Sequence, residues 1–271
     1  MTTNARKTAV VTGASSGIGR ASADALRRAG YNVFGTSRQP VAEVREGVTM
    51  LTCDVRDDDS VAALVADVLA ETGRIDLLVN NAGIGLLGGA EESSSAQAQA
   101  LFDVNVFGVV RMTNGVLPAM RSQKSGRIVN LSSILGLIPS PYGALYSSSK
   151  HAIEGYSESL DHELRTFGIR VVLVEPGFTR TSFEANLTRP DRPLPAYDQV
   201  RRRTEDVMRA GVETGDAPQI VAATVVKAAT APRPKLRYAA GKQAGQTSLL
   251  RRFVPQGAFD KSLRRQMGLP V

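Results

Sequence analysis

The 271-residue sequence contains one cysteine, Cys53. A single thiol excludes an internal disulfide and a thiolate metal cluster. Only two histidines are present, His151 and His162, and no third ligand accompanies them, so we predict no metal site. The sequence has no apolar run of the ~18–20 residues that a membrane span needs, and its first residues lack an apolar stretch of signal-peptide type. We therefore expect a cytoplasmic protein with no transmembrane segment.

The composition that remains is ordinary for one globular domain. Hydrophobic residues make up 42% and charged residues 22%, and the length suits a single domain over residues 1–271. The net charge of +7 comes largely from arginines late in the chain. A basic surface can bind nucleic acid, an anionic lipid surface or an acidic carrier protein, or it can be a solvated surface without such a partner. Because no known nucleic-acid-binding motif accompanies the charge, we expect no nucleic-acid partner.

Short apolar runs alternate with helical patterns along most of the chain. The strand-like runs are residues 8–11, 31–38, 48–53, 75–79, 127–131, 169–174 and, less clearly, 235–240. One long helix is expected over residues 95–121. This alternation predicts an α/β fold, a Rossmann-type doubly wound parallel sheet in three layers, α/β/α. Ligands of such sheets bind at the carboxyl ends of the strands, where the sequence places Gly13, Arg38, Asp54, Asn80, Ser133 and Pro176.

A glycine-rich turn joins the first strand to the first helix. Gly13, Gly17 and Gly19 have the spacing G-x3-G-x-G. Glycines there let the backbone approach a pyrophosphate, and the helix N-terminus offers it free N–H groups. The second strand ends in Ser37 and Arg38, with no carboxylate. Because an arginine at this place accommodates a 2′-phosphate, whereas an acidic residue binds the 2′-hydroxyl, the sequence favours NADP.

Tyr146 and Lys150 are four residues apart in a predicted helix and so share one face. A free tyrosine has a pKa of ~10, and a nearby ammonium group lowers it by favouring the phenolate. We expect this effect to suit Tyr146 to proton transfer. Ser133, at the end of a strand, could hydrogen-bond the same substrate oxygen. The pair alone also fits a half-buried tyrosine beside a lysine whose stem covers apolar surface.

Taken together, these motifs resemble the classical short-chain dehydrogenase/reductase family over residues 5–240. The matched residues are Thr12, Gly13, Gly17, Gly19, Asp54, the segment 80–83, Asn105, Ser133, Tyr146, Lys150, Pro176 and Gly177. The resemblance implies that Tyr146 is the general acid/base, and that Lys150 lowers its pKa and holds the nicotinamide ribose. It also implies that Ser133 binds the substrate oxygen and that Asn105 anchors a proton-relay water.

For the cofactor, the resemblance implies binding by a longer set of residues. They are Gly13, Ser15, Ser16, Gly17, Ile18, Gly19, Ser37, Arg38, Asp54, Val55, Asn81, Ala82, Gly83, Tyr146, Lys150, Pro176, Gly177, Thr179 and Thr181. In this set Asp54 meets the adenine, and Asn81 and Gly83 line the ribose side. Ser37 and Arg38 resemble the NADP-preferring members.

The resemblance implies an oxidoreductase that transfers a hydride between NADP and a ketone, aldehyde or secondary alcohol. Residues 145–155 are similar to members that act on steroids, retinoids and other apolar molecules. One alternative is a reductase of 3-oxoacyl-[acyl carrier protein] or 3-oxoacyl-CoA, with the arginines docking an acidic carrier. Another is a non-catalytic NADP sensor or scaffold. We expect a small-molecule substrate and a homodimer or homotetramer.

Two segments after residue 177 depart from the strand–helix pattern. Residues 180–212 begin with a proline-rich polar stretch, and we expect a mobile flap over the substrate. Residues 241–271 form a basic, amphipathic C-terminal extension. There Leu249, Leu250 and Phe253 alternate with arginines, which predicts a buried face packed on the domain or on a neighbouring subunit.

Overall fold

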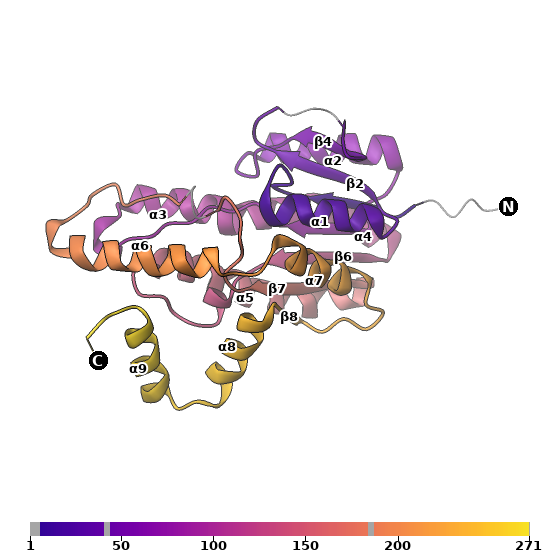
Figure 1. The fold of residues 1–271 in the computed structure, drawn as a ribbon. Coiled ribbons are helices and arrows are strands. Elements are labelled where there is room, and N and C mark those ends of the chain that lie inside the picture. Colours follow the sequence, from indigo (N-terminus) through magenta and orange to yellow (C-terminus); the bar gives the residue numbers. More distant parts are fainter. Residues whose placement is uncertain (1–5, 41–43, 184–186, 271) are drawn as a thin grey trace.

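The structure, a computed structural model, describes residues 6–40, 44–183 and 187–270 (Figure 1). Its strands are β1 (Thr8–Val11), β2 (Asn32–Ser37), β3 (Val44–Arg45), β4 (Val48–Thr52), β5 (Leu77–Asn80), β6 (Gly126–Leu131), β7 (Ile169–Pro176) and β8 (Arg237–Ala240). Its α-helices are α1 (Gly17–Arg28), α2 (Asp58–Thr72), α3 (Ser95–Phe102), α4 (Gly108–Gln123), α5 (Ala144–Leu164), α6 (Asp198–Glu213), α7 (Pro218–Thr230), α8 (Lys242–Phe253) and α9 (Gln256–Gln266).

The strands form one sheet in the order β3-β4-β2-β1-β5-β6-β7-β8. Every pair is parallel except β3 with β4. The chain first builds outward from β1 to β2 and β4, and then returns to place β5 on the other side of β1. The predicted doubly wound fold is confirmed. The two-residue strand β3 was not predicted, because so short a segment carries no periodic pattern.

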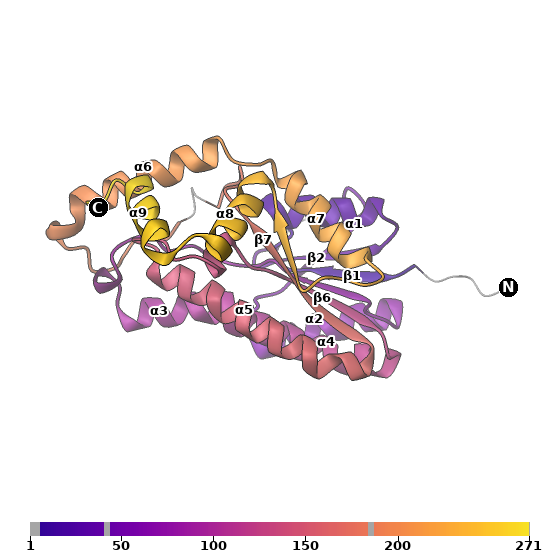
Figure 2. The same cartoon turned by 90° about the horizontal axis from the view of Figure 1, so that it is seen from below.

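Alternate residues along each strand face opposite layers. Ala9 and Val11 of β1 pack in the cluster that contains the buried faces of α1 and α7. Val10, between them, packs in the cluster that contains those of α2, α4 and α5. Figure 2 shows the two helix layers on either side of the sheet. Since both faces are covered, most positions of the central strands are buried and apolar, as in other buried parallel strands.

Local signals set the ends of α2. The Asp57 side chain accepts hydrogen bonds from the backbone N–H groups of Asp59 and Ser60, at 2.9 and 3.1 Å. This cap explains why the helix begins at the run of aspartates 57–59. Gly73 ends the helix in the left-handed conformation, with φ of 67°, which glycine adopts without steric cost.

The single long helix predicted over residues 95–121 is wrong in one respect. A π-helical turn, η2 (Asp103–Phe107), separates α3 from α4. The backbone N–H of Gly108 donates to the carbonyl of Asp103, five residues back. The turn holds Asn105, whose side chain bonds to both backbone groups of Ile84, in the loop after β5. π-helical turns inside α-helices are frequent at functional sites.

The C-terminal extension forms a helical hairpin, α8 and α9, that projects from the body (Figure 1). The sequence predicted that its apolar residues pack on the domain or on a neighbouring subunit. The chain's own domain leaves three of them exposed, and packing on a neighbouring subunit stays a prediction. Leu249, Leu250 and Phe253 are 61%, 53% and 72% exposed. Helix α8 leaves the sheet directly after β8, and Ala244 is its only buried residue.

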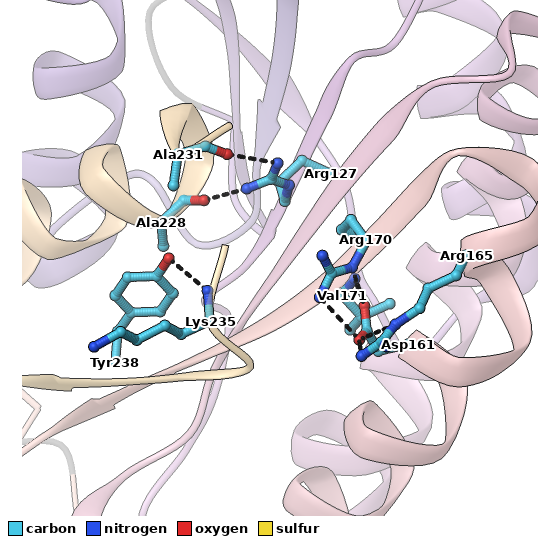
Figure 3. Close-up of polar contacts among 9 residues, drawn as sticks. All are labelled: Arg127, Asp161, Arg165, Arg170, Val171, Ala228, Ala231, Lys235 and Tyr238. Carbon is cyan, nitrogen blue, oxygen red and sulfur yellow. Dashed lines mark hydrogen bonds and ion pairs between the residues drawn. The ribbon is translucent and has the colours of Figure 1, made fainter. Parts of the chain in front are cut away.

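Several arginines form hydrogen bonds near the amino edge of the sheet (Figure 3). Asp161 is fully buried, and burial alone would raise the pKa of its carboxyl. Hydrogen bonds from Arg170 and Arg165 outweigh that effect and keep the pKa below its usual range. Arg127 donates to the carbonyls of Ala228 and Ala231 at the end of α7. Part of the basic excess therefore stabilises the fold.

Candidate active site

A cavity of about 1230 Å³ opens at the carboxyl edge of the sheet. Its lining includes every residue that the sequence assigned to the cofactor, from Gly13 in the first turn to Thr181 after β7. Ser133, Tyr146 and Lys150 line it as well. Asn105 does not, because it is buried behind the wall. The structure thus gathers residues from distant parts of the sequence around one space.

The glycine-rich turn packs closely on its own backbone and on the loop that follows β5. A Cβ added to Gly19 would lie 2.2 Å from the Gly13 carbonyl oxygen, a distance that no side chain tolerates. Gly13 and Gly17 have positive φ angles of 65° and 56°. Within the described residues no side chain caps the start of α1, where Ser16 is the N-cap residue. The first N–H groups of α1 therefore remain available for an anion.

The side of the cavity at β2 and β4 is positively charged. Arg38 follows β2 and is exposed, and no carboxylate among the described residues pairs with it. Asp54 is held instead by Arg56, whose guanidinium reaches its two carboxylate oxygens at 3.0 and 2.5 Å. Hydrogen bonding from the Arg56 side chain lowers the pKa of Asp54 to about 2. Arg56, which sequence reasoning missed, also lines the cavity.

Tyr146 and Lys150 lie together, as the spacing predicts. The Lys150 Nζ atom is 5.7 Å from the centre of the Tyr146 ring and donates to the Leu131 carbonyl oxygen at 2.8 Å. The prediction that Lys150 lowers the pKa of Tyr146 is wrong for the protein by itself. Burial raises the pKa of Tyr146 to about 12, although hydrogen bonding with Ser133 lowers it in part. Burial also lowers the pKa of Lys150 to about 8, partly offset by the charge of Glu154.

Ser133 stands where β6 gives way to a short 3-10 turn. Its side-chain oxygen accepts a hydrogen bond from the Leu135 N–H at 3.1 Å. That contact uses a lone pair, so the hydroxyl hydrogen can be donated, either to the Tyr146 oxygen or to an oxygen atom of a bound molecule. Ser133 is partly exposed to the cavity beside Tyr146. Both side chains can therefore hydrogen-bond one oxygen atom of a bound molecule.

Asn105 reaches Tyr146 through a residue that sequence reasoning missed. Its amide nitrogen donates to the Ser149 hydroxyl at 3.2 Å. Ser149 in turn donates to the backbone carbonyl of Tyr146 at 2.7 Å. The side chain of Asn105 is fully engaged in these bonds and those to Ile84, so it fixes the helical turn that carries Tyr146. Ser149 is one of three consecutive serines, 147–149, and nothing in the sequence distinguishes it from the other two.

A cluster of charged side chains lies behind Lys150. Glu154, one turn further along α5, accepts a hydrogen bond from Arg237 of β8 at 2.8 Å. Glu175 of β7 lies 3.6 Å from the same guanidinium. Burial raises the pKa of Glu175 to about 7, and the neighbouring charge of Glu154 adds to the effect. Arg237 also binds Glu158, at 2.9 Å. The sequence gave no indication that these glutamates meet.

The outer part of the cavity is apolar and comes largely from the C-terminal half of the chain. The lining residues there are Leu135, Ile138, Phe183, Leu187, Val207, Met208, Leu250, Val254, Phe259 and Leu263. Helix α8 contributes the face formed by Gln243, Thr247, Leu250 and Val254. That spacing is helical and could have identified a lining face, but the sequence alone did not show what the face covers.

The segment predicted as a flap does lie over the cavity. Thr181, Phe183 and Thr188 line it, while residues 184–186 lie outside the described part. Beyond them the chain is tied to the start of α3. Asp191 accepts hydrogen bonds from the backbone and side chain of Ser94, at 2.8 and 2.5 Å. The last part of the predicted flap, residues 198–212, lies in helix α6. The mobility of this segment stays a prediction.

The described residues contain neither a helix suited to span a membrane nor a cluster of metal ligands. None of their helices has the length and apolar character needed to span a bilayer. They also contain no group of three or more histidine, cysteine, aspartate or glutamate side chains placed to hold a metal ion.

Comparison with known proteins agrees with this geometry. Residues 7–192 match the family described as short chain dehydrogenase. A 3-ketodihydrosphingosine reductase from Bacteroides thetaiotaomicron is 37% identical over 86% of this chain and 87% of its own length. Retinol dehydrogenase 8 from Bos taurus is 34% identical over 94% of this chain and 88% of its own.

Solved structures give the same result. A short-chain dehydrogenase from Streptomyces avermitilis has a TM-score of 0.80 and 35% identity, and the match covers 98% and 96% of the two chains. A metagenomic short-chain oxidoreductase in complex with NADP has a TM-score of 0.67 and 31% identity, over 86% and 96%. One from Burkholderia phymatum in complex with NAD has a TM-score of 0.77 and 27% identity, over 97% and 94%.

Proposed function

The chain belongs to the short-chain dehydrogenase family, and from this premise we propose that it is an NADP-dependent reductase of apolar ketones or aldehydes. The observation that carries the proposal is the meeting of Ser133, Tyr146 and Lys150 in one cavity with the glycine-rich turn. Such a cavity can hold a dinucleotide and a second molecule together.

The residues around the cavity fit NADP. The N–H groups at the start of α1 would bind the pyrophosphate, and Gly19 leaves room for close approach. Arg38, exposed and without a carboxylate partner among the described residues, would bind the 2′-phosphate. The end of β2, at Ser37 and Arg38, carries no aspartate or glutamate for the 2′-hydroxyl. Asp54, which follows β4, is held by Arg56. When bound, NADPH supplies a hydride to the carbonyl carbon.

Tyr146 supplies the proton. A phenol with a pKa of about 12 stays protonated near neutral pH, so it is a donor and not a base in the resting protein. A carbonyl oxygen that is becoming an alkoxide is a stronger base than a phenolate and takes this proton, which leaves Tyr146 as phenolate until solvent reprotonates it. The raised pKa keeps the phenol protonated, as the proton donor of a reduction must be.

The neighbouring groups orient and stabilise this proton donor. Lys150 carries a positive charge near the ring and stabilises the phenolate that remains after transfer. Ser133 donates to the same substrate oxygen as Tyr146 and so fixes its position. Asn105, acting through Ser149, holds the turn of α5 on which Tyr146 stands.

The apolar outer cavity supports an apolar substrate. Side chains such as Phe183, Met208 and Leu263 offer no hydrogen bonds and favour a hydrocarbon body. Two of the relatives are named for 3-ketodihydrosphingosine and for retinol, which are molecules of this kind. The homodimer or homotetramer and the cytoplasmic location expected from the sequence stay predictions.

A screen of NADPH oxidation tests the proposal. Steroid ketones, retinal, aliphatic ketones and an acetoacetyl thioester would be compared, and we expect turnover with one of the apolar carbonyls. Preference for the thioester would favour the 3-oxoacyl reductase alternative. NADPH binding without turnover of any substrate would favour the sensor.

The variant Tyr146→Phe tests the proton donor. It keeps the ring and removes the hydroxyl, so NADPH should bind normally while turnover falls by about 10²–10⁴-fold. Tyr142→Phe is the matched control, because this nearby tyrosine is absent from the cavity lining. Near-normal turnover by Tyr146→Phe, with an unchanged pH profile, would contradict the mechanism.

A further inference from the structure

The α8–α9 hairpin is anchored at its base. Ala244, in the first turn of α8, is buried, and so is Met267, directly after α9. Arg203 of α6 donates to the Gly268 carbonyl oxygen at 2.6 Å. These contacts fix both ends of the hairpin to the body, while its tip, the loop that joins α8 to α9, points away from it (Figure 1).

The tip presents large apolar side chains to solvent. Leu249 and Phe253 are four residues apart and so share one face of α8, and Leu250 extends that face toward the cavity. All three are exposed. More than half of each side chain is exposed among the described residues. An exposed cluster of this kind marks a surface that binds something apolar.

The hairpin that carries the apolar tip is basic. The hairpin residues 242–266 contain six basic side chains and one acidic one, Asp260. The basic ones are Lys242, Arg251, Arg252, Lys261, Arg264 and Arg265. None pairs with a carboxylate of the described residues. Arg251 and Arg252 instead lie over the rings of Phe259 and Phe253, at 5.4 and 5.6 Å from the ring centres.

We propose that the tip of the α8–α9 hairpin docks on an anionic lipid surface. A helix that combines exposed leucine and phenylalanine with arginines binds at the boundary between headgroups and acyl chains. There the apolar side chains leave water and the guanidinium groups meet lipid phosphates. The tip projects from the body (Figure 1), which suits a fluid surface better than a rigid partner.

The charge argues against a second copy as the occupant. Two hairpins packed tip to tip would bring clusters of the same sign together, with no acidic side chain on either tip except Asp260 to compensate. A lipid surface that carries negative charge has the complementary sign and requires no matching shape.

Docking would also bring the cavity close to the lipid. Leu250, Val254, Phe259 and Leu263 of the hairpin line its outer part. If the proposed function holds, an apolar substrate dissolved in the bilayer would reach the cavity along this wall. Lipid docking itself does not depend on that function, because it rests on the exposed tip alone.

Flotation with vesicles tests the docking. The full-length protein would be mixed with phosphatidylcholine vesicles that contain either no anionic lipid or about one third phosphatidylglycerol. We expect binding to the anionic vesicles that weakens with salt. The double variant Leu249→Ser/Phe253→Ser should bind at least about tenfold more weakly, since both side chains supply the apolar contact. Arg251→Gln/Arg252→Gln should lose about 25-fold, at roughly fivefold for each cation near an anionic surface.

Matched controls exclude general effects on surface hydrophobicity and charge. Phe167→Ser removes an exposed aromatic residue near the amino edge of the sheet. Arg27→Gln/Arg28→Gln removes two exposed arginines at the end of α1. Both controls should bind vesicles like the unmodified protein. Turnover of a water-soluble ketone separates this proposal from the proposed function, because tip variants should retain it.

Three results would overturn the proposal. The first is an unmodified protein that stays unbound on anionic vesicles at low salt. The second is equal loss of binding in the tip variants and the controls. The third is a change of molar mass in light scattering when Leu249→Ser/Phe253→Ser is introduced, with vesicle binding unchanged, because this would show that a second copy covers the tip.

Discussion

Replacing Glu175 by glutamine should stabilise the folded protein at alkaline pH. Glu175 is 1% exposed, and its carboxyl has a pKa of about 7 instead of the ordinary 4.5. Its only cationic neighbour among the described residues, Arg237, is closer to Glu154 and Glu158. Glutamine keeps the shape and removes the charge, so Arg237 retains its two better partners.

The size of the effect follows from the raised pKa. Between pH 4.5 and pH 7 the folded protein holds a proton at Glu175 that the unfolded chain has lost, so the free energy of unfolding decreases as the pH rises through this window. Above pH 7 the ionised carboxylate costs about 3 kcal/mol in the folded state, since a tenfold change in acidity corresponds to about 1.4 kcal/mol. Glu175→Gln should remove this cost at about pH 8.5 and have little effect near pH 4.5.

Urea unfolding of variant and unmodified protein at both pH values measures the difference directly. Glu158→Gln serves as the control, because this glutamate binds the same arginine but is half exposed. An exposed pair contributes ~0–1 kcal/mol, so this variant should be slightly less stable or unchanged. The reasoning fails if Glu175→Gln is no more stable than the unmodified protein at about pH 8.5. It also fails if the gain in stability is the same at both pH values.

Two further predictions concern the cofactor and the pH dependence of the rate. Ser37→Asp should weaken NADPH binding about tenfold or more by repelling the 2′-phosphate and should strengthen NADH binding; fluorescence titration measures both, and equal affinities in the unmodified protein would remove the argument. The rate of ketone reduction should fall as the pH rises through about 8, because Lys150 then loses its proton and its stabilising charge. A pH–rate profile that stays flat to about pH 10, the ordinary range of a lysine, would show that its charge is not needed.

The sequence was sufficient to predict the sheet and the edge that carries the site. Apolar strands of β-branched residues, alternating with helices, allow few other folds, and the glycine-rich turn and Ser133 both follow such strands. The tyrosine–lysine spacing also predicted a real contact. These features are local or follow from parallel topology alone.

Properties that depend on distant contacts were not predictable. The pKa of Tyr146 is set mainly by burial, and the spacing to Lys150 says nothing of how much solvent reaches the phenol. The meeting of Glu154 with Glu175 requires β7, β8 and α5 to be packed together. The exposure of Leu249 and Phe253 depends on the direction in which α8 leaves the sheet, and helical periodicity does not contain that direction.

The π-helical turn at Asp103–Phe107 has a consequence for the two helices that it joins. One additional residue in a turn rotates everything after it by about 100° relative to a regular α-helix. This rotation lets α4 bury Met112 and Val116 against the sheet while Gln97 of α3 holds the segment over the cavity, through the carbonyl of Arg189 and the N–H of Asp191. The turn therefore sets the rotation of α4, which packs in the core, relative to α3, which binds the segment over the cavity. Deleting one residue there would give a more regular helix whose two halves could no longer make both sets of contacts.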